Sequence, residues 1–280
     1  MSRVAAARAA IDGMGGMGAI LASRPGSAIR VLEYHLFVYR RSWRGTLFST
    51  FLSPVLFLAA IGIGLGSLVD EAQGGGVAGV TYLAFLAPGL LVANAMQSAT
   101  FESTYPVMAG LIWLRTFVAM VTAPLRPFDV VIGTLLFVAF RLLIAAVVFV
   151  VVAIVFGAVD PLPGIAMIPA AVLTGLAFSA PIMAFSATQR SDNGFSALFR
   201  FVITPLFLFS GVFFPITQLP PLIQPIAYLT PLWHGVALAR GIALGTLDVT
   251  LAFINITVLC GFIVVGALLA GIAFSRKLVK

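Results

Sequence analysis

Charged residues are scarce in this sequence, because Asp, Glu, Lys and Arg together make up only 9% of its 280 residues. Soluble domains carry about 25%, so the shortage argues against a soluble globular protein. Apolar residues reach 61% instead, and several apolar runs have the length of about 20 residues with which a helix crosses a bilayer. The period-two alternation of a membrane β-barrel is absent. The sequence therefore predicts an all-α integral membrane protein, since each helix satisfies its own backbone hydrogen bonds in lipid.

Residues and motifs that carry enzyme chemistry are also few. The single cysteine, Cys260, excludes an intramolecular disulfide. The two histidines, His35 and His234, fall on opposite sides of the membrane in the topology given below, so they cannot share a metal site. The sequence contains no G-x-x-x-x-G-K-[ST], no H-E-x-x-H and no G-x-S-x-G. We therefore expect no catalytic, cofactor-binding or metal-binding residues, and no P-loop hydrolysis of nucleotide on this chain.

The formal net charge of +7 comes from basic residues at the ends of apolar runs, so nucleic acid is not an expected partner. Six apolar segments predict six spans, at about 46–69, 80–100, 130–158, 165–187, 198–214 and 251–274. The basic residues gather on one side of these spans, which by the positive-inside rule predicts cytoplasmic termini. We expect a multi-pass protein of the bacterial plasma (inner) membrane. Residues 1–28 are predicted to be a flexible cytoplasmic N-terminus without a cleavable signal peptide.

A separate amphipathic helix is predicted before the first span, at 29–44. Apolar and basic residues fall on opposite faces there: Ile29, Leu32, Leu36, Tyr39 and Trp43 on one, Arg30, Arg41 and Arg44 on the other. Such a helix lies in the membrane interface with its basic residues toward the headgroups. The alternative is a positively charged flank whose periodicity is accidental.

Prolines break the segment after the fifth span, although that segment stays apolar. Each proline removes a backbone donor and resists a continuous helix. We predict two short re-entrant helices at about 215–245, dipping into the outer leaflet, because irregular backbone persists at membrane depth only where protein or water surrounds it. The alternative is a compact extracellular hairpin. The residues of interest in this region are Pro215, Pro220, Pro221, Tyr228, Trp233 and His234.

Few ionisable residues fall inside the predicted spans. Arg141 lies in the third, and Glu102 and Arg200 lie at a similar depth near the cytoplasmic side. A charge at that depth costs at least about 2.5 kcal/mol, so a partner or a water-filled cavity is expected. Glu102 is the expected partner of Arg141. The three residues are candidates for a substrate path or gate, and the alternative is snorkelling combined with a structural ion pair.

Six segments carry a family resemblance: FLAPGLL (85–91), FESTYPVM (101–108), RTFVAMVTAPLRPFDVVIG (115–133), LTGLAFSAPIMAFSA (173–187), TPLFLFSGVFFPITQLP (204–220) and LTPLWHGVALARG (229–241). Together they resemble the permease subunits of ABC type-2 exporters. The nodulation, lipo-oligosaccharide exporter branch is the most similar, with drug-exporter permeases as near relatives. The likeness covers about 30–275, and it implies that residues 29–280 form one type-2 permease domain.

The resemblance implies a functional unit of two permeases and two ATPase subunits that bind ATP and Mg. The second permease would be a copy of this chain or a different one. This chain would then form half of a substrate path and move an amphipathic molecule outward: a glycolipid, a lipid-linked saccharide or a hydrophobic drug. Two other classes stay open, an ATP-independent transporter or channel and a membrane scaffold without transport.

The resemblance also implies a cytoplasmic coupling helix in the connection from Glu102 to Asp129, which Pro106 and Pro127 are expected to bound. Its candidate contacts with the ATPase are Trp113, Leu114, Arg115 and Phe117. Their spacing predicts that Trp113, Leu114 and Phe117 share one helical face. Such a face could instead lie against the protein's own spans or the lipid. The stretch VMAGLIWL (107–114) is more apolar than the family pattern, so a charge-by-charge transfer of the ATPase contact is not made.

Overall fold

The structure is a computed structural model that describes residues 25–72, 77, 79–123 and 125–278. Helices make up most of this described chain, and its one β interaction is the isolated bridge between Val77 and Val80. The prediction of an all-α protein is therefore confirmed. The predicted N-terminus at 1–28 lies outside the described residues except for 25–28, which already belong to a helix.

The helices follow one another along the chain with few long connections. The first half contains α3 (Pro25–Phe57), the π-helix η1 (Leu58–Leu65), α4 (Gly66–Ala72), α5 (Tyr82–Met108), the π-helix η2 (Ala109–Trp113), α6 (Thr116–Thr122) and α7 (Pro127–Val155). The second half contains α8 (Pro161–Thr188), α9 (Asn193–Leu198), the π-helix η3 (Phe199–Ile203), α10 (Thr204–Phe209), the 3-10 turn η4 (Ile216–Gln218), α11 (Gln224–Tyr228), α12 (Pro231–Ala243) and α13 (Val249–Leu278).

Four helical stretches of the described chain are long and apolar enough to cross a membrane: Tyr82–Trp113, Pro127–Val155, Pro161–Thr188 and Val249–Leu278. They correspond to the predicted second, third, fourth and sixth spans. The predicted fifth span, 198–214, overlaps the shorter apolar helix Asn193–Phe209 but extends five residues beyond its end. The predicted first span falls within the continuous run from α3 to α4, many of whose side chains lie outside the described residues. The number of crossings stays a prediction.

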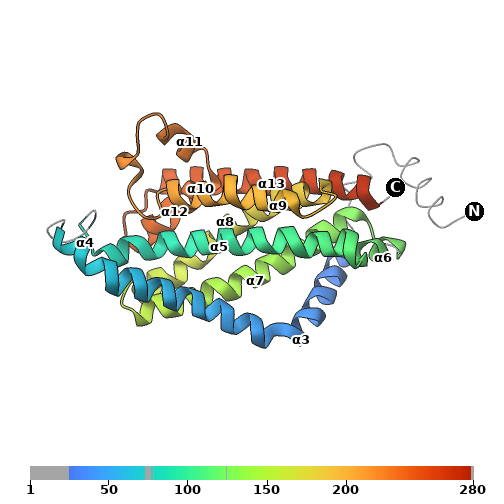
Figure 1. Cartoon of the computed structure of the whole chain (residues 1–280), viewed down its shortest axis with the longest axis horizontal. Coiled ribbons are helices and arrows are strands. Elements are labelled where there is room, and N and C mark those ends of the chain that lie inside the picture. The colour runs from blue at the N-terminus through green and yellow to red at the C-terminus, as the bar shows by residue number, and fades with distance from the viewer. Residues whose placement is uncertain (1–24, 73–76, 78, 124, 279–280) are drawn as a thin grey trace, which may run out of the picture.

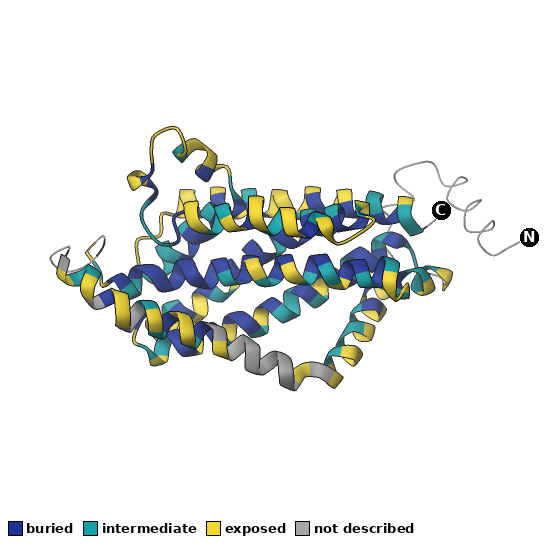
Figure 2. Ribbon diagram, viewed as in Figure 1, coloured by how far each residue is buried: buried dark blue, intermediate teal, exposed yellow. Residues whose placement is uncertain are grey.

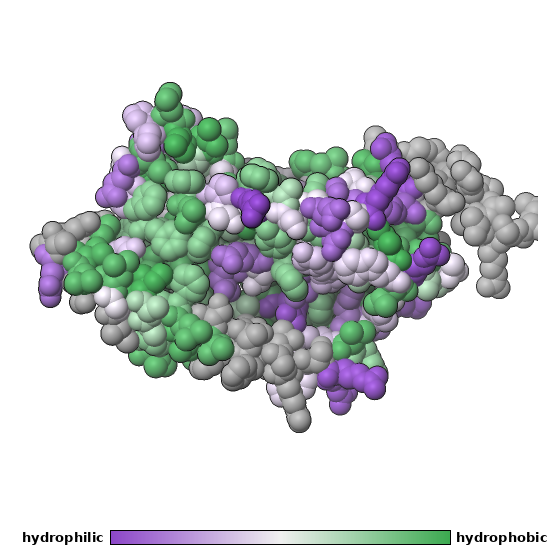
Figure 3. Space-filling view, viewed as in Figure 1, coloured by the Kyte–Doolittle hydropathy of each residue, from purple (hydrophilic) through white to green (hydrophobic). Residues whose placement is uncertain are grey.

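Helix α8 occupies the centre of the bundle and packs against α5, α7, α12 and α13. Small residues permit these close approaches, as is usual between membrane helices. A Cβ atom on Gly175 would lie 2.5 Å from Leu142 Cδ1 of α7 and 3.2 Å from the Ala95 carbonyl of α5. Figure 2 shows the buried residues concentrated on α5 and α8, with exposed ones on the outer helices. In Figure 3, apolar side chains cover much of the visible face, and hydrophilic ones gather in the half nearer the C-terminus.

The interfacial helix is not a separate element, because it forms the first part of α3. Figure 1 shows α3 bending, with this part at an angle to the bundle. The helix contacts α7 through Ala28 and Val31, which are buried. A Cβ atom on Gly133 would lie 2.5 Å from Val31 Cβ, so the glycine permits the contact. Ile29 and Trp43 of the predicted apolar face remain exposed, and the membrane contact of this face stays a prediction.

The prediction that Pro106 bounds the coupling segment is wrong. Helix α5 passes through Pro106 to Met108 and continues as η2 to Trp113, so Glu102 lies inside a helix and not in a loop. Proline is tolerated in membrane helices where local π adjustments satisfy the freed backbone groups. Pro127 does mark a boundary, since it occupies the first turn of α7, where its missing donor and fixed φ suit a helix start.

The two ends of the bundle carry different features. In Figure 1 the start of α3, the turn at α6 and the end of α13 lie at one end. The short helices α11 and α12 lie at the opposite end. This arrangement agrees with an even number of crossings and with a coupling segment on the side of the termini. Which end faces the cytoplasm stays a prediction.

Candidate functional site

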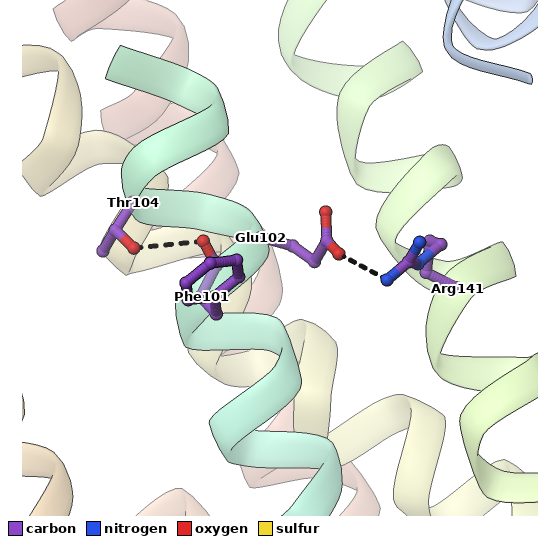
Figure 4. Close-up of polar contacts among 4 residues, drawn as sticks. All are labelled: Phe101, Glu102, Thr104 and Arg141. Carbon is purple, nitrogen blue, oxygen red and sulfur yellow. Dashed lines mark hydrogen bonds and ion pairs between the residues drawn. The ribbon is translucent and has the colours of Figure 1, made fainter. Parts of the chain in front are cut away.

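An ion pair joins α5 to α7 inside the helical region, and Figure 4 shows its two side chains pointing toward each other. Arg141 Nη2 lies 2.8 Å from Glu102 Oε1, with side-chain exposures of 20% and 16%. The Arg141 guanidinium also lies over the ring of Tyr39, 4.9 Å from its centroid, which brings α3 into the contact. The expected pairing is therefore confirmed, and it ties three helices together. Its role in a substrate path or gate stays a prediction.

Arg200 does not join this pair. It lies in η3, is exposed, and forms no ion pair within the described residues. It lines an open surface hollow together with Phe199, Phe201 and Thr204. The sequence grouped Arg200 with Arg141 and Glu102 because the three residues have a similar predicted depth in the membrane. In the structure Arg200 lies on a different helix and is more exposed than the other two.

A narrow cleft runs between α3, α5, α7 and α10 and contains two amide side chains that the sequence reasoning missed. Asn94 and Gln97 both belong to α5, and neither has a hydrogen-bond partner among the described residues. The remaining lining residues are apolar or aromatic: Pro54, Phe57, Leu90, Phe149 and Phe207. Gln97 is exposed and Asn94 is half-buried, so Asn94 is the amide for which a missing partner is costly in apolar surroundings. The sequence signal that could have identified this site is the pair of amides, Asn94 and Gln97, about one helical turn apart in the otherwise apolar second span.

The connection after η2 turns sharply at Arg115, whose φ of 52° is the only positive value on a non-glycine residue in the described chain. We call Trp113, Leu114 and Arg115 the 113–115 turn. All three are exposed, Trp113 to 55% and Leu114 to 72%. A left-handed conformation costs a residue with a Cβ about 1–2 kcal/mol, so the surrounding structure must hold this turn. It projects apolar and basic groups from the end of the bundle that carries α6.

The prediction that Phe117 shares a face with Trp113 and Leu114 is wrong. Phe117 is only 2% exposed, because the turn at Arg115 reverses the chain and directs this ring inward. Its ring centroid lies 5.8 Å from that of Phe274 in α13. A Cβ atom on Gly110 would lie 2.6 Å from the Phe117 ring, so a glycine is needed there. Phe117 is a packing residue of the coupling segment.

Helix α12 is inserted among α5, α8 and α13, and its residues Leu232, Val236 and Ala239 are buried. This placement agrees with a re-entrant helix and not with a hairpin standing outside the bundle. Its partner, α11, is a shorter helix of five residues. The prolines occupy the connections: Pro215 precedes η4, and the exposed Pro220 and Pro221 precede α11.

Aromatic and polar contacts fix the start of α12. The Thr230 hydroxyl accepts a hydrogen bond from the Trp233 backbone, as an N-cap does. The Trp233 ring packs edge-on against Tyr228 and His234, with centroids 4.7 Å and 4.9 Å away. His234 Nδ1 lies 2.8 Å from Asn255 Oδ1 of α13, and both residues are buried. These predicted residues therefore anchor α12 to α11 and α13.

Arg240 of α12 is a third residue that the sequence reasoning missed. Its Nε donates to the Phe85 carbonyl at 3.2 Å, and its Nη2 donates to the Gly211 and Val212 carbonyls at 3.0 and 3.2 Å. Its guanidinium carbon also lies 3.8 Å from the centroid of the Phe85 ring. The sequence shows a lone basic residue near the outer side, but its acceptors are backbone atoms that no side-chain pattern identifies.

His35 anchors the first part of α3 to α7. Its ring stacks on Phe137 at 4.9 Å, and its Nε2 lies 3.3 Å from Thr134 Oγ1. Burial lowers the pKa of His35 to about 4, so the imidazole is neutral near pH 7. Among the described residues, no cluster of three His, Cys, Asp or Glu side chains could hold a metal ion.

Comparison with known proteins gives a family match over most of the chain. Residues 30–244 match the family described as ABC-2 type transporter. Nodulation protein J of Rhizobium leguminosarum bv. viciae is 34% identical over 252 residues, which cover 88% of this chain and 95% of that protein. Nodulation protein J of Sinorhizobium fredii is 30% identical over 94% of this chain and 98% of its own length. The inner membrane transport permease YadH of Escherichia coli is 25% identical over 78% of this chain and 82% of its own length.

Proposed function

This chain belongs to the ABC-2 type transporter family, and we propose that it is the permease subunit of an ATP-driven exporter in the bacterial plasma membrane. The observation that carries the proposal is the family match over 30–244 in a chain that contains no P-loop. Export needs an energy source, and a chain without a nucleotide-binding motif takes it from a partner. ATP and Mg would therefore bind to a separate ATPase subunit.

The 113–115 turn is the proposed contact with that ATPase. Its exposed tryptophan and arginine are residue types that are enriched among the hot spots of protein interfaces. The turn sits at the end of the long helix Tyr82–Trp113, so movement imposed on the turn is passed to α5 along a rigid element. The Glu102–Arg141 pair would carry this movement to α7, and Tyr39 would carry it to α3.

The cleft between α3, α5, α7 and α10 has a volume of about 30 Å³, which is room for a water molecule or two, so it would have to widen during transport, and it is the chemistry of its lining that supports an amphipathic substrate. Its aromatic lining suits an acyl chain or an apolar ring system, and Asn94 and Gln97 offer amide donors and acceptors without a partner among the described residues. Sugar hydroxyls are suitable partners for such amides. A glycolipid or lipid-linked saccharide satisfies both features, whereas a hydrophobic drug satisfies only the first. The names of the nodulation proteins specify no substrate, so this argument rests on the cleft.

The assembly would contain two permeases and two ATPases, with a second copy of this chain, or a related one, completing the path. With six crossings and cytoplasmic termini, the 113–115 turn would face the ATPase and α12 would face the outside. The position of α6 and α12 at opposite ends of the bundle supports this orientation.

Reconstitution tests the proposal. The chain is co-expressed with the P-loop ATPase encoded nearest to it, purified as a complex and placed in proteoliposomes. A fluorescent glycolipid and a fluorescent hydrophobic drug without sugar serve as probes. We expect ATP-dependent movement of the glycolipid, abolished when the P-loop lysine of the ATPase is replaced. Asn94→Leu should slow the glycolipid at least about fivefold more than the drug, since loss of a hydrogen bond that leaves a polar group unsatisfied costs about 1–3 kcal/mol.

The other outcomes distinguish the alternatives. Movement that persists with the inactive ATPase would identify an ATP-independent transporter or channel. A stable complex that moves neither probe, with or without ATP, would favour a membrane scaffold. Faster movement of the drug than of the glycolipid, with no effect of Asn94→Leu, would overturn the assignment of the amides to a sugar headgroup.

A further inference from the structure

Arg240 connects three backbone segments that are far apart in the sequence. The residue belongs to α12, and its acceptors are Phe85 in the first turn of α5 and Gly211 and Val212 directly after α10. Two of its three acceptors therefore lie in the irregular stretch that follows the helix Asn193–Phe209. One guanidinium thus ties the ends of α5 and α10 to α12.

Backbone atoms and one aromatic ring, rather than a carboxylate, compensate the charge of Arg240. The residue forms no ion pair within the described part of the chain. The Gly211 and Val212 carbonyls accept directly from the guanidinium, and the Phe85 ring adds a cation–π contact. Because backbone groups compensate the charge of Arg240, this compensation is lost if the first turn of α5 or residues 211–212 move away from α12.

The stretch after α10 needs such donors. The chain leaves the helix at Ser210 and turns at Gly211, whose φ is +81°, so its carbonyls have no helical partners. Unsatisfied carbonyls are costly in a membrane. A second, weaker tie is made by the Tyr82 hydroxyl, which donates to the Phe213 carbonyl at 3.3 Å. Arg240 thus supplies donors at the place where the helix has ended.

A glycine on α5 permits this arrangement. A Cβ atom on Gly89 would lie 3.0 Å from the Val212 carbonyl oxygen and 3.2 Å from Arg240 Nη2. Both distances are tighter than ordinary side-chain contacts, so an alanine there would require the carbonyl and the guanidinium to shift away from α5 by a few tenths of an ångström. Val212 itself is fully buried. The close approach of its backbone to α5 therefore depends on both Gly89 and Arg240.

We propose that Arg240 is a positioning residue that holds the end of the transport path closed, by fastening residues 211–212 to α5 and α12. The role in closing a transport path rests on the proposed export function, whereas the fastening of residues 211–212 is a property of this chain. Release of the guanidinium would free the ends of α5, α10 and α12 to separate. Arginine suits this role better than lysine, because its planar fork donates in several fixed directions at once.

The fastening is tested by the chemical accessibility of Val212. The full-length chain with its ATPase is placed in lipid nanodiscs, where a water-soluble maleimide reaches both faces and topology does not matter. Cys260→Ser removes the natural thiol, and Val212→Cys supplies the reporter. Without nucleotide, we expect Arg240→Gln to raise the labelling rate about tenfold, which corresponds to about 1.4 kcal/mol. Arg240→Lys should give an intermediate rate, and Arg200→Gln, a change at an exposed arginine, should give the wild-type rate.

Two further variants separate positioning from general folding. Gly89→Ala should raise labelling of the Val212 reporter in the same direction, even if Arg240→Gln does not assemble. A second reporter, Met183→Cys, occupies a fully buried site on α8 and should stay unlabelled in every variant. Equal labelling of Val212→Cys in the wild type, Arg240→Gln and Gly89→Ala backgrounds would overturn the proposal. Faster labelling of both reporters would also overturn it, because Arg240 would then support the whole fold.

The role in closing the path is tested on the same samples with ATP, Mg and orthovanadate, which traps ABC ATPases after hydrolysis. We expect the trapped state to change wild-type labelling of the Val212 reporter at least threefold, and Arg240→Gln to remove this dependence on nucleotide. A wild-type rate that is identical with and without nucleotide would overturn the role in closure. The nucleotide-free arm needs no transport, so failure of the exporter assignment would leave the measured fastening intact.

Discussion

The Glu102–Arg141 pair offers a prediction whose magnitude follows from the structure. The proposed perturbations are Glu102→Gln, Arg141→Gln and the double variant. Removing one partner of a fully buried pair costs about 3–5 kcal/mol, because the other charge remains buried and unpaired. The two side chains are 16% and 20% exposed, so partial hydration lowers the expected cost to about 2–3 kcal/mol for each single variant. Arg141→Ala should cost more than Arg141→Lys, which keeps the charge.

The assay is thermal unfolding of the purified permease in detergent, followed by the intrinsic fluorescence of its three tryptophans. A loss of 1 kcal/mol lowers the midpoint by about 2–4 °C in chains of 150–250 residues. We therefore expect each single variant to melt about 5–10 °C below the wild type, with about 2–3 kcal/mol lost. The double variant should melt no lower than the worse single one, since removing both charges leaves none unpaired. Arg200→Gln is the matched control and should leave the midpoint unchanged.

A double variant whose loss equals the sum of the two single losses would refute the reasoning. Additivity would mean that the two charges do not interact, despite the separation of 2.8 Å between Nη2 and Oε1. Single variants with wild-type midpoints and wild-type export would show that Arg141 is compensated by water or lipid headgroups. The contact with Tyr39 would then be the remaining reason for its place on α7.

Three further predictions concern topology, coupling and pH. Cysteines at Asp160 should react with an impermeant maleimide outside intact cells and cysteines at Ser191 should not; external labelling at 191 would contradict six crossings. Trp113→Ala should reduce co-purification of the ATPase about tenfold, as expected for an interface anchor worth over 1 kcal/mol. Phe117→Asp should instead unfold the segment around α6, because the Phe117 ring is buried. Full recovery of the ATPase with Trp113→Ala would move the ATPase contact away from the 113–115 turn. Burial lowers the pKa of His35 to about 4 in the folded protein, against about 6.5 in the unfolded chain. The contribution of His35 to the free energy of unfolding is therefore complete above pH 6.5 and falls by at most about 3 kcal/mol as the pH drops toward 4. A melting midpoint that depends equally on pH in His35→Phe would contradict this assignment.

Features that depend on a short stretch of sequence were predictable. Long apolar runs determine helices in a membrane whatever their neighbours are, which is why the predicted spans coincide with α5, α7, α8 and α13. The ion pair was predictable for a related reason. A lone arginine and a lone glutamate in apolar surroundings each need a partner, and Glu102 and Arg141 were the pair available at one depth.

Features that depend on packing were not predictable from local pattern. Pro106 is a helix breaker in isolation, yet α5 continues through it because the π-helix η2 absorbs the disturbance. The spacing of Trp113 and Phe117 suggests one face only if the helix is continuous. The left-handed turn at Arg115 separates them, and it is compatible with the fold because Gly110 leaves room for the Phe117 ring.

Arg240 shows most clearly why part of the site could not be found from the sequence. Sequence reasoning finds charged residues by their complements, so it looks for a carboxylate opposite each arginine. The partners of Arg240 are the carbonyls of Phe85, Gly211 and Val212, groups that every residue carries and that become distinctive only where a helix ends. The helix break after α10 is visible in the prolines and glycines that follow it. A lone basic residue in a membrane chain with a predicted helix break is therefore a candidate donor to the freed carbonyls, but only the packing of α5, α10 and α12 shows which carbonyls Arg240 reaches.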